Sequence, residues 1–381
     1  MKYNFDEIAN RKNTNSVKYD EFDSELPMWV ADMDFRVAPA IESAIKKQLE
    51  ILAIGYSLIP DEFFNSFANF YKKHYGTTFS KNEMVYVSGV VASIDATLKR
   101  IGNKGDNVVV LAPIYHTFYH CIENNNKKVL PSNFLVNDGK YQIDFLDLEK
   151  KLSSKESSIL LLCNPHNPIG KIFSKEELLK ISKLADKYGV FVISDEIHGL
   201  LASPNTKYIP YSNVSVNDNY MVCLSNSKAF NIAGLQSAIA VIPNEEKRKL
   251  LQDAFYEDDI GEPNFFAVSA NIAALNESEK WLAELNEYIY ENKKVFFEKV
   301  NEIPRLKVYW GDATYMMWVE YQNDINSREF VKKLNEEEGL LVSPGIQFGE
   351  SGEHHFRINL ATSRKNVLKA IQKLKHFMEG K

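Results

Sequence analysis

Cysteine is scarce in this chain of 381 residues, which contains only Cys121, Cys163 and Cys223. Their small number and wide spacing exclude a disulfide scaffold and a multi-cysteine zinc site, and they suit a reducing compartment. The 17 glycines and 13 prolines are too few and too scattered for a collagen-like or low-complexity chain. The class that remains is that of folded globular proteins.

Basic charge is not in excess either, because 45 Lys and Arg stand against 51 Asp and Glu, for a net charge of −6. A nucleic-acid-binding surface usually needs a basic excess, so that class is disfavoured. No apolar run approaches the roughly 18 residues of a membrane helix, and the polar residues 1–22 do not resemble a signal peptide. We therefore expect a soluble cytoplasmic protein with neither a nucleic acid nor a membrane as partner.

The middle of the chain alternates short apolar runs with longer amphipathic stretches, which indicates an α/β fold with a mainly parallel sheet. One helix is marked by a capping box, Ser174 to Glu177, ahead of apolar residues at helical spacing. Another is expected over Ala92–Ile101. The predicted strands are Met84–Ser88, Asn107–Ala112, Ser158–Cys163, Val190–Ser194, Tyr220–Ser225 and Ser237–Ile242.

The pattern changes after about residue 270, where fewer strands and a long charged helix indicate a smaller α+β domain. The helix over Glu277–Val300 is expected to bridge the two parts. The remaining predicted elements are a strand at Thr314–Tyr321, a helix at Ser327–Glu338, a strand at His355–Ala361 and a helix at Ser363–Met378.

Polar residues gather where four of the predicted strands end: Ser88–Val91, Asn164–Gly170, Asp195–His198 and Ser225–Lys228. In an open parallel sheet, ligands bind at the carboxyl ends of the strands. Each of these segments alone is most often a helix cap, a turn or a solvated side chain. Their joint occurrence on one edge predicts a pocket that holds an amine, a carboxylate, an amide and an imidazole.

Several well-known signatures are missing, which narrows the chemistry of that pocket. The chain has no G-x-G-x-x-G after its first strand, no G-x-x-x-x-G-K-[ST], no H-E-x-x-H and no G-x-S-x-G. Glu353, His354 and His355 are adjacent, and neighbours on an extended chain point to opposite faces. We therefore predict no metal site.

A lysine near one strand end and an aspartate at the next meet the needs of pyridoxal phosphate, since Lys228 can form a Schiff base and Asp195 can keep the pyridine nitrogen protonated. At these residues the sequence resembles the fold type I pyridoxal-phosphate enzymes of the aspartate aminotransferase superfamily. Within them it is similar to the cystathionine β-lyase-like C–S lyases, a branch that includes a maltose-regulon modulator. The resemblance runs from Pro27 to the last helix. It is carried by Pro27–Phe35, Gly55–Ser57, Asn164–Gly170, Ser194–His198 and Ser227–Leu235.

This resemblance implies a large domain with a mainly parallel, seven-stranded sheet and a smaller α+β domain. Residues 1–45 would be an N-terminal segment that packs with the small domain. Residues 46–275 would form the large cofactor-binding domain, and residues 276–381 the small domain. The family also implies a homodimer with a shared active site.

The resemblance assigns roles around the cofactor ring. Lys228 would form the Schiff base and later move the Cα proton, while Asp195 would pair with the pyridine N–H; with Tyr115 they would be the catalytic residues. Asn167 would bind the ring 3′-oxygen. His198 stands where many aminotransferases have a tyrosine for that purpose, which marks the lyase-like branch. Tyr115 would stack on the ring.

The phosphate and the substrate would be held by further groups. The backbone N–H groups of Gly89, Val90 and Val91 would bind the phosphate at a helix N-terminus, where donors and dipole favour an anion. The resemblance adds the hydroxyls of Ser225 and Ser227 to this site.

Tyr56 would reach the phosphate from the partner subunit. Arg357 would hold the substrate α-carboxylate with its two-pronged guanidinium, beside Asn167 and Trp29. One departure is Gln236, because many aminotransferases of this fold have a phosphate-binding arginine at that position. Its absence favours the lyase branch.

Three functions stay open. The leading one is a β-lyase that cleaves cystathionine or related cysteine thioethers to a thiol, pyruvate and ammonia, since a thiol, with a pKa of about 8.5, leaves readily. An aminotransferase would use the same residues but return the proton to the cofactor. A regulatory protein on this fold is the third, although binding alone needs no Schiff-base lysine.

Overall fold

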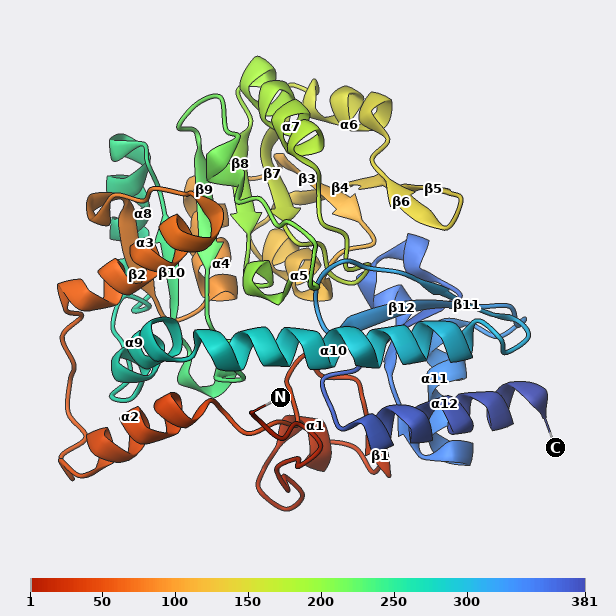
Figure 1. Ribbon diagram of the computed structural model, residues 1–381. Helices are drawn as coiled ribbons and strands as arrows, with labels where there is room; N and C mark the ends of the chain where they lie inside the picture. The colour runs from red at the N-terminus through yellow and green to blue at the C-terminus, as the bar shows by residue number, and fades with distance from the viewer. Residues whose placement is uncertain (1, 381) are drawn as a thin grey trace.

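The structure is a computed structural model that describes residues 2–380, and its largest feature is a seven-stranded sheet (Figure 1). All strands are parallel except β10, which is antiparallel to both neighbours. The predicted mainly parallel sheet is confirmed. In spatial order the strands are β2 (Met84–Val87), β10 (Ala238–Val241), β9 (Tyr220–Leu224), β8 (Phe191–Asp195), β7 (Ser157–Cys163), β3 (Asn107–Ala112) and β4 (Lys128–Asn133).

Each central strand has apolar side chains on both of its faces, which explains why helices cover both faces of the sheet. In β3, Val108 and Val110 join one buried cluster, whereas Val109 and Leu111 join the other. One face is covered by α4 (Val90–Arg100), α5 (His116–Asn124) and α8 (Glu245–Glu257). The other face is covered by α3 (Asp61–Tyr75), α6 (Phe145–Leu152), α7 (Lys175–Tyr188) and α9 (Ala267–Glu277).

The six predicted strands of this sheet all form, each within one residue of its predicted ends. The capping box is also present: the Ser174 hydroxyl accepts from the Glu177 N–H at 3.1 Å, and the Glu177 carboxylate accepts from the Ser174 N–H at 2.8 Å. Strand β4 was not predicted. It lies at the sheet edge, contains Pro131 and is mostly exposed, so it lacks the apolar run that marks the central strands.

The C-terminal part holds a second, four-stranded antiparallel sheet in the order β11 (Leu306–Tyr309), β12 (Met316–Tyr321), β15 (His355–Asn359) and β14 (Ser343–Pro344). The long helix α10 (Glu279–Val300) crosses the middle of the molecule (Figure 1). Helices α11 (Ser327–Glu338) and α12 (Arg364–Glu379) complete this part, so its predicted elements are confirmed. Strand β12 begins two residues later than expected, since Thr314 has a positive φ of 64°.

The N-terminal segment contacts both parts of the molecule. Its short strand β1 (Leu26–Pro27) pairs in parallel with β13 (Leu340–Leu341), while α2 (Pro39–Leu49) packs against α9. Residues 28–35, here called the strap, run between these contacts. The domain limits at 45/46 and 275/276 stay a prediction. The other elements are α1 (Val17–Asp20) and the hairpin of β5 (Leu135–Asn137) and β6 (Lys140–Gln142).

Among residues 2–380, no helix combines the length and the apolar character needed to cross a membrane. The segment after α2 is nonetheless rich in exposed apolar side chains. Those exposed by more than half are Ile51, Leu52, Ile54, Tyr56 and Leu58.

Candidate active site

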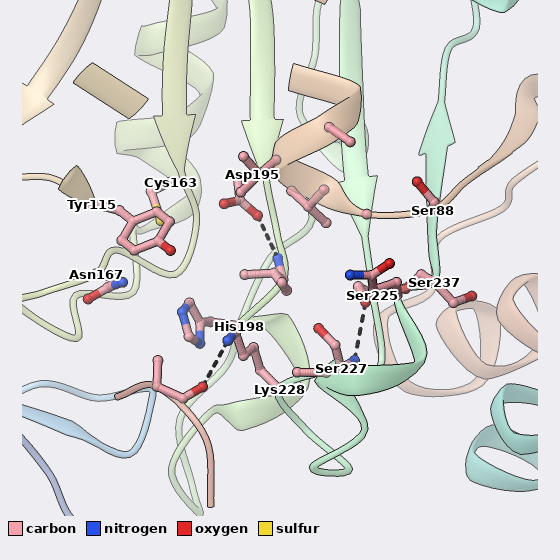
Figure 2. A pocket seen from close by; sticks show the side chains of 18 of the residues that line it. Ser88, Tyr115, Cys163, Asn167, Asp195, His198, Ser225, Ser227, Lys228 and Ser237 are labelled. Carbon is pink, nitrogen blue, oxygen red and sulfur yellow. Dashed lines mark hydrogen bonds between the residues drawn. The ribbon is translucent and has the colours of Figure 1, made fainter. Parts of the chain in front are cut away.

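The four predicted polar segments meet around one cavity of about 620 Å³ at the carboxyl ends of β7, β8 and β9 (Figure 2). The sheet register brings them level, because Asp195 at the end of β8 lies beside Cys163 of β7 and Cys223 of β9. The predicted residues in the cavity wall are Ser88 to Val91, Tyr115, Asn167, Asp195, His198, Ser225, Ser227 and Lys228. The wall also includes Ala31, Ala92, Asp95, Cys121, Cys163, Ile197, Ala233, Gln236 and Ser237.

Lys228 lies in the loop after β9, with its amine beside the cavity (Figure 2). Its Nζ donates to the Ala31 carbonyl at 2.8 Å. Burial lowers the pKa of this amine below its ordinary value. The nearby Asp32 and Asp195 charges oppose that shift, and the Arg357 charge adds to it. A lysine with a lowered pKa can act as a nucleophile or a base near neutral pH.

Asp195 is a buried carboxylate that has one hydrogen bond from the described residues, from the Ile197 N–H at 3.0 Å. Burial raises the pKa of this carboxyl to about 7, and the Ile197 bond and the Lys228 charge counteract that shift. A cation placed beside it would keep it ionised. The protonated nitrogen of a pyridine ring is such a cation.

Tyr115, Asn167 and His198 lie together at one end of the cavity (Figure 2). Tyr115 stands directly before α5, so its position is set by the start of that helix. His198 is buried, and its Nδ1 has no hydrogen-bond partner among residues 2–380. Burial, with the Lys228 and Arg357 charges, lowers the pKa of His198 to about 3, so the ring is neutral. An unpartnered polar atom here fits a polar ring substituent.

The opposite end of the cavity suits a phosphate. Gly89 precedes the first residue of α4, and a Cβ built on it would meet nothing within 4 Å. The Ser225 hydroxyl accepts from the Ser227 N–H at 3.1 Å and donates to the Ser237 carbonyl at 2.7 Å. The open N-terminus of α4 therefore supplies N–H donors beside hydroxyls, which is a suitable cradle for an anion. Gln236 lies in this wall with a positive φ of 46°.

Arg357 is a buried cation in β15 without a carboxylate partner among the described residues. Its Nη1 donates to Asn167 Oδ1 at 3.1 Å and its Nη2 to the Trp29 carbonyl at 3.0 Å, while Nε has no partner. The guanidinium lies 4.8 Å from the centre of the Phe348 ring. Burial lowers its pKa to about 10, which leaves it charged near neutral pH. A ligand carboxylate would complete this site.

Three predicted residues do not line the cavity: Arg357, which donates to Asn167 of the wall, Trp29 and Tyr56. The Trp29 indole N–H donates to the Lys18 carbonyl at 3.2 Å, so only the backbone of Trp29 holds Arg357. Tyr56 is 99% exposed and lies outside the cavity wall of this chain. Their roles toward substrate and phosphate stay predictions.

The strap belongs to the site, which the residue patterns did not indicate. The Asn231 side chain accepts from the Met33 N–H and donates to the Met33 and Phe35 carbonyls. The Asn359 amide donates to two further strap carbonyls. Both asparagines follow a predicted site residue closely, Lys228 and Arg357 respectively, and the strap lies within Pro27–Phe35, which carries the resemblance, but neither signal indicates these hydrogen bonds.

The comparisons with known proteins agree with this geometry. The family model described as aminotransferase class I and II matches residues 31–374. Cystathionine β-lyase PatB of Bacillus subtilis is 34% identical over 98% of this chain and 99% of its own length. A PLP-bound putative aminotransferase from Clostridium difficile has a TM-score of 0.94 and 34% identity over 98% of this chain and 99% of that chain. The PLP-bound C–S lyase from Staphylococcus hominis has a TM-score of 0.94 and 31% identity over 100% of this chain and 99% of that chain.

Proposed function

Because the chain belongs to the aminotransferase class I and II family, we propose that it is a pyridoxal-phosphate-dependent C–S β-lyase. The substrate is L-cystathionine or a related cysteine thioether, and the products are a thiol, pyruvate and ammonia. The observation that carries the proposal is the shared cavity of Lys228 and Asp195, with Arg357, which has no carboxylate partner among residues 2–380, at its side. The names of the PatB and Staphylococcus hominis relatives support the lyase reaction over other chemistry of this family.

The residues present fit the cofactor at both of its ends. The N-terminus of α4, with Ser225 and Ser227, would hold the phosphate, and Asp195 would hold the protonated pyridine nitrogen. Tyr115 would lie against the ring, and Asn167 and His198 would lie beside its 3′-oxygen. When bound, pyridoxal phosphate supplies the electron sink that makes the Cα proton of an amino acid acidic.

The chain itself then binds the substrate and moves the proton. Arg357 holds the α-carboxylate through its two-pronged guanidinium, which orients the amino acid in the cavity. Lys228, whose pKa is lowered by burial, would bond the cofactor at rest and would take the Cα proton during turnover. The β-sulfur leaves as a thiolate because thiols ionise at a pKa of about 8.5.

An aminotransferase is the second candidate, and the description of the similar Clostridium difficile structure as an aminotransferase favours it. It would use Lys228 and Asp195 in the same way. The difference is the fate of the carbon skeleton, which leaves with its β-substituent intact.

We propose further that the enzyme is a cytoplasmic homodimer. The exposed apolar segment 51–58 has the character of a surface that a second copy covers, and Tyr56 lies at its centre. The three cysteines are free and buried, which suits a reducing compartment.

The proposal is tested by reducing the purified enzyme with borohydride and mapping the pyridoxyl group by peptide mass spectrometry. We expect the label on Lys228 and release of a thiol from L-cystathionine before reduction. A label on another lysine would contradict the proposal. So would the absence of thiol release by an enzyme that borohydride labels on Lys228.

A further inference from the structure

One backbone carbonyl at the cavity, that of Ala31, accepts two hydrogen bonds. Lys228 Nζ donates to it at 2.8 Å, and the Tyr315 hydroxyl donates to it at 2.9 Å. Tyr315 is fully buried, and burial raises the pKa of its hydroxyl far above the ordinary value, so it remains a donor. The two donors come from different parts of the chain, the loop after β9 and the segment before β12.

Hydrogen bonds to the residues before and after Ala31 in the strap fix the position of its carbonyl. Asn359 Nδ2 donates to the Val30 and Asp32 carbonyls at 2.6 Å each. Asn231 Nδ2 donates to the Met33 carbonyl at 3.0 Å. Because its neighbours are bound, the Ala31 carbonyl has little freedom to turn toward another donor.

A neutral C=N bond to the cofactor would leave Lys228 Nζ without a hydrogen to donate to this carbonyl. Condensation of its neutral amine with the aldehyde forms one C=N bond, and both amine hydrogens leave with the aldehyde oxygen as one water. The carbonyl then keeps a single donor, the Tyr315 hydroxyl. A carbonyl in a filled cavity wall that loses all its donors is costly.

We propose that Tyr315 is a positioning residue that keeps the Ala31 carbonyl bonded while Lys228 is attached to the cofactor. The same carbonyl receives the lysine amine whenever an amino acid displaces it. This inference rests on the proposed attachment of the cofactor to Lys228. Lys228 exchanges between the cofactor and the Ala31 carbonyl. The two states are close in free energy, because the carbonyl has a donor in both.

Removing the hydroxyl shifts that balance in a defined direction. In Tyr315→Phe the carbonyl has Lys228 as donor in the free-amine state and no donor in the bonded state. The bonded state is therefore destabilised relative to the free amine. We expect the dissociation constant of the covalently held cofactor, followed by its visible absorbance, to rise about tenfold.

A second measurement must move the opposite way. L-Alanine, which has no β-leaving group, displaces Lys228 without elimination. The alanine concentration that converts half of the absorbance should fall by about the same factor of ten in Tyr315→Phe. A purely structural role for the hydroxyl would not produce this pair of opposed shifts.

Tyr321→Phe is the matched control, because the Tyr321 hydroxyl also donates to a backbone carbonyl, that of Ile325 at 3.0 Å, away from the cavity. Both constants should stay at the wild-type values there. Equal values in wild type and Tyr315→Phe, or equal shifts in both variants, would overturn the inference. Should Tyr315→Phe not fold, 3-fluorotyrosine at position 315 is a stronger donor of the same shape. It should tighten retention of the cofactor, and weaker retention would overturn the inference as well.

The outcome is separate from that of the proposed function. A wild-type enzyme with no borohydride-reducible bond at Lys228 contradicts the proposed function. A reducible bond at Lys228 with unchanged constants in Tyr315→Phe contradicts only the role of Tyr315.

Discussion

Two lysines of this chain differ in what surrounds them: Lys293 is fully buried, whereas Lys228 is partly buried beside the cavity. Burial lowers the pKa of both, and that of Lys293 falls to about 7. The Nζ of Lys293 donates to three carbonyls, those of Gly311, Ala313 and Thr314, and no part of the residue is exposed. The Nζ of Lys228 has one acceptor within the described part of the chain, and a cavity lies beside it. A lowered pKa therefore does not identify a reactive lysine, whereas uncommitted hydrogens next to open space do.

The three acceptors of Lys293 explain its structural role. They lie in the turn that follows Trp310, at a place where two glycine backbones touch. A Cβ on Gly170 would come within 2.9 Å of the Ala313 carbonyl, and one on Gly311 within 2.6 Å of the Ile169 carbonyl. Lys293 thus holds a close crossing between the loop that carries Asn167 and the C-terminal part of the chain.

Replacement of Lys228 should have the largest effect, because only this lysine of the two is expected to react. Lys228→Ala should lose the reducible bond to the cofactor and at least about 1000-fold of the lyase rate, since it removes both the attachment point and the base. The visible spectrum after borohydride treatment and the rate of thiol release check this. Full turnover by the variant, with a reducible bond elsewhere, would show that the wrong lysine was chosen.

Replacement of Asp195, the carboxylate expected at the pyridine nitrogen, should have the second-largest effect. In Asp195→Asn the cofactor should remain bound through its phosphate, while the rate falls about 100-fold, because an amide cannot stabilise the protonated pyridine. Stopped-flow turnover and the cofactor content of the purified variant decide this together. A rate within a few-fold of wild type would mean that Asp195 does not face the ring nitrogen.

Replacement of Lys293, the structural lysine, should change the stability of the protein and not its chemistry. Lys293→Met should lower the free energy of unfolding by about 2 kcal/mol, since it leaves carbonyls without donors, yet the reducible bond at Lys228 should persist. Chemical denaturation and borohydride labelling measure the two effects. Loss of the label in a folded Lys293→Met variant would make the two lysines functionally equivalent, against the structure.

The smallest effect is a pH dependence of the cofactor-free protein. Burial raises the pKa of Asp195 to about 7, above the value of about 3.9 in an unfolded chain. The folded state then binds this proton more tightly, so the stabilisation is complete below pH about 4 and is lost as the pH rises through about 7. Asp195→Asn lacks this group, so its stability should fall less than that of wild type as the pH rises from about 4 to about 7.

Denaturation of the two cofactor-free proteins at several pH values provides the test. The neighbouring Glu196, whose pKa burial also raises to about 7, is present in both and serves as an internal reference. Parallel stability curves for the two proteins would show that Asp195 titrates normally.

The sequence predicted the parts of this molecule that depend on local pattern. The central strands follow from unbroken apolar runs, and their polar ends predicted which segments meet at the cavity. Edge strand β4 was missed because an exposed strand with a proline lacks such a run. The resemblance named Lys228, Asp195 and Arg357, all of which lie at or beside the cavity.

What the sequence did not reveal are contacts between groups far apart in the chain. The Ala31 carbonyl and Tyr315 are separated by 284 positions, and a backbone carbonyl carries no residue-specific signal. Trp29 was expected at the substrate, but its indole bonds the Lys18 carbonyl instead of lining the cavity. Tyr56 was expected to act from a second copy, and a single chain does not test that prediction.

The most direct test of the central claim is a product analysis of the holoenzyme with L-cystathionine and no keto-acid acceptor. A β-lyase should release thiol, pyruvate and ammonia in equal amounts over many turnovers, because the β C–S bond breaks while the cofactor is regenerated. Mass spectrometry of a single turnover decides the outcome. One equivalent of pyridoxamine phosphate with an intact β-substituted keto acid would contradict the lyase and identify an aminotransferase.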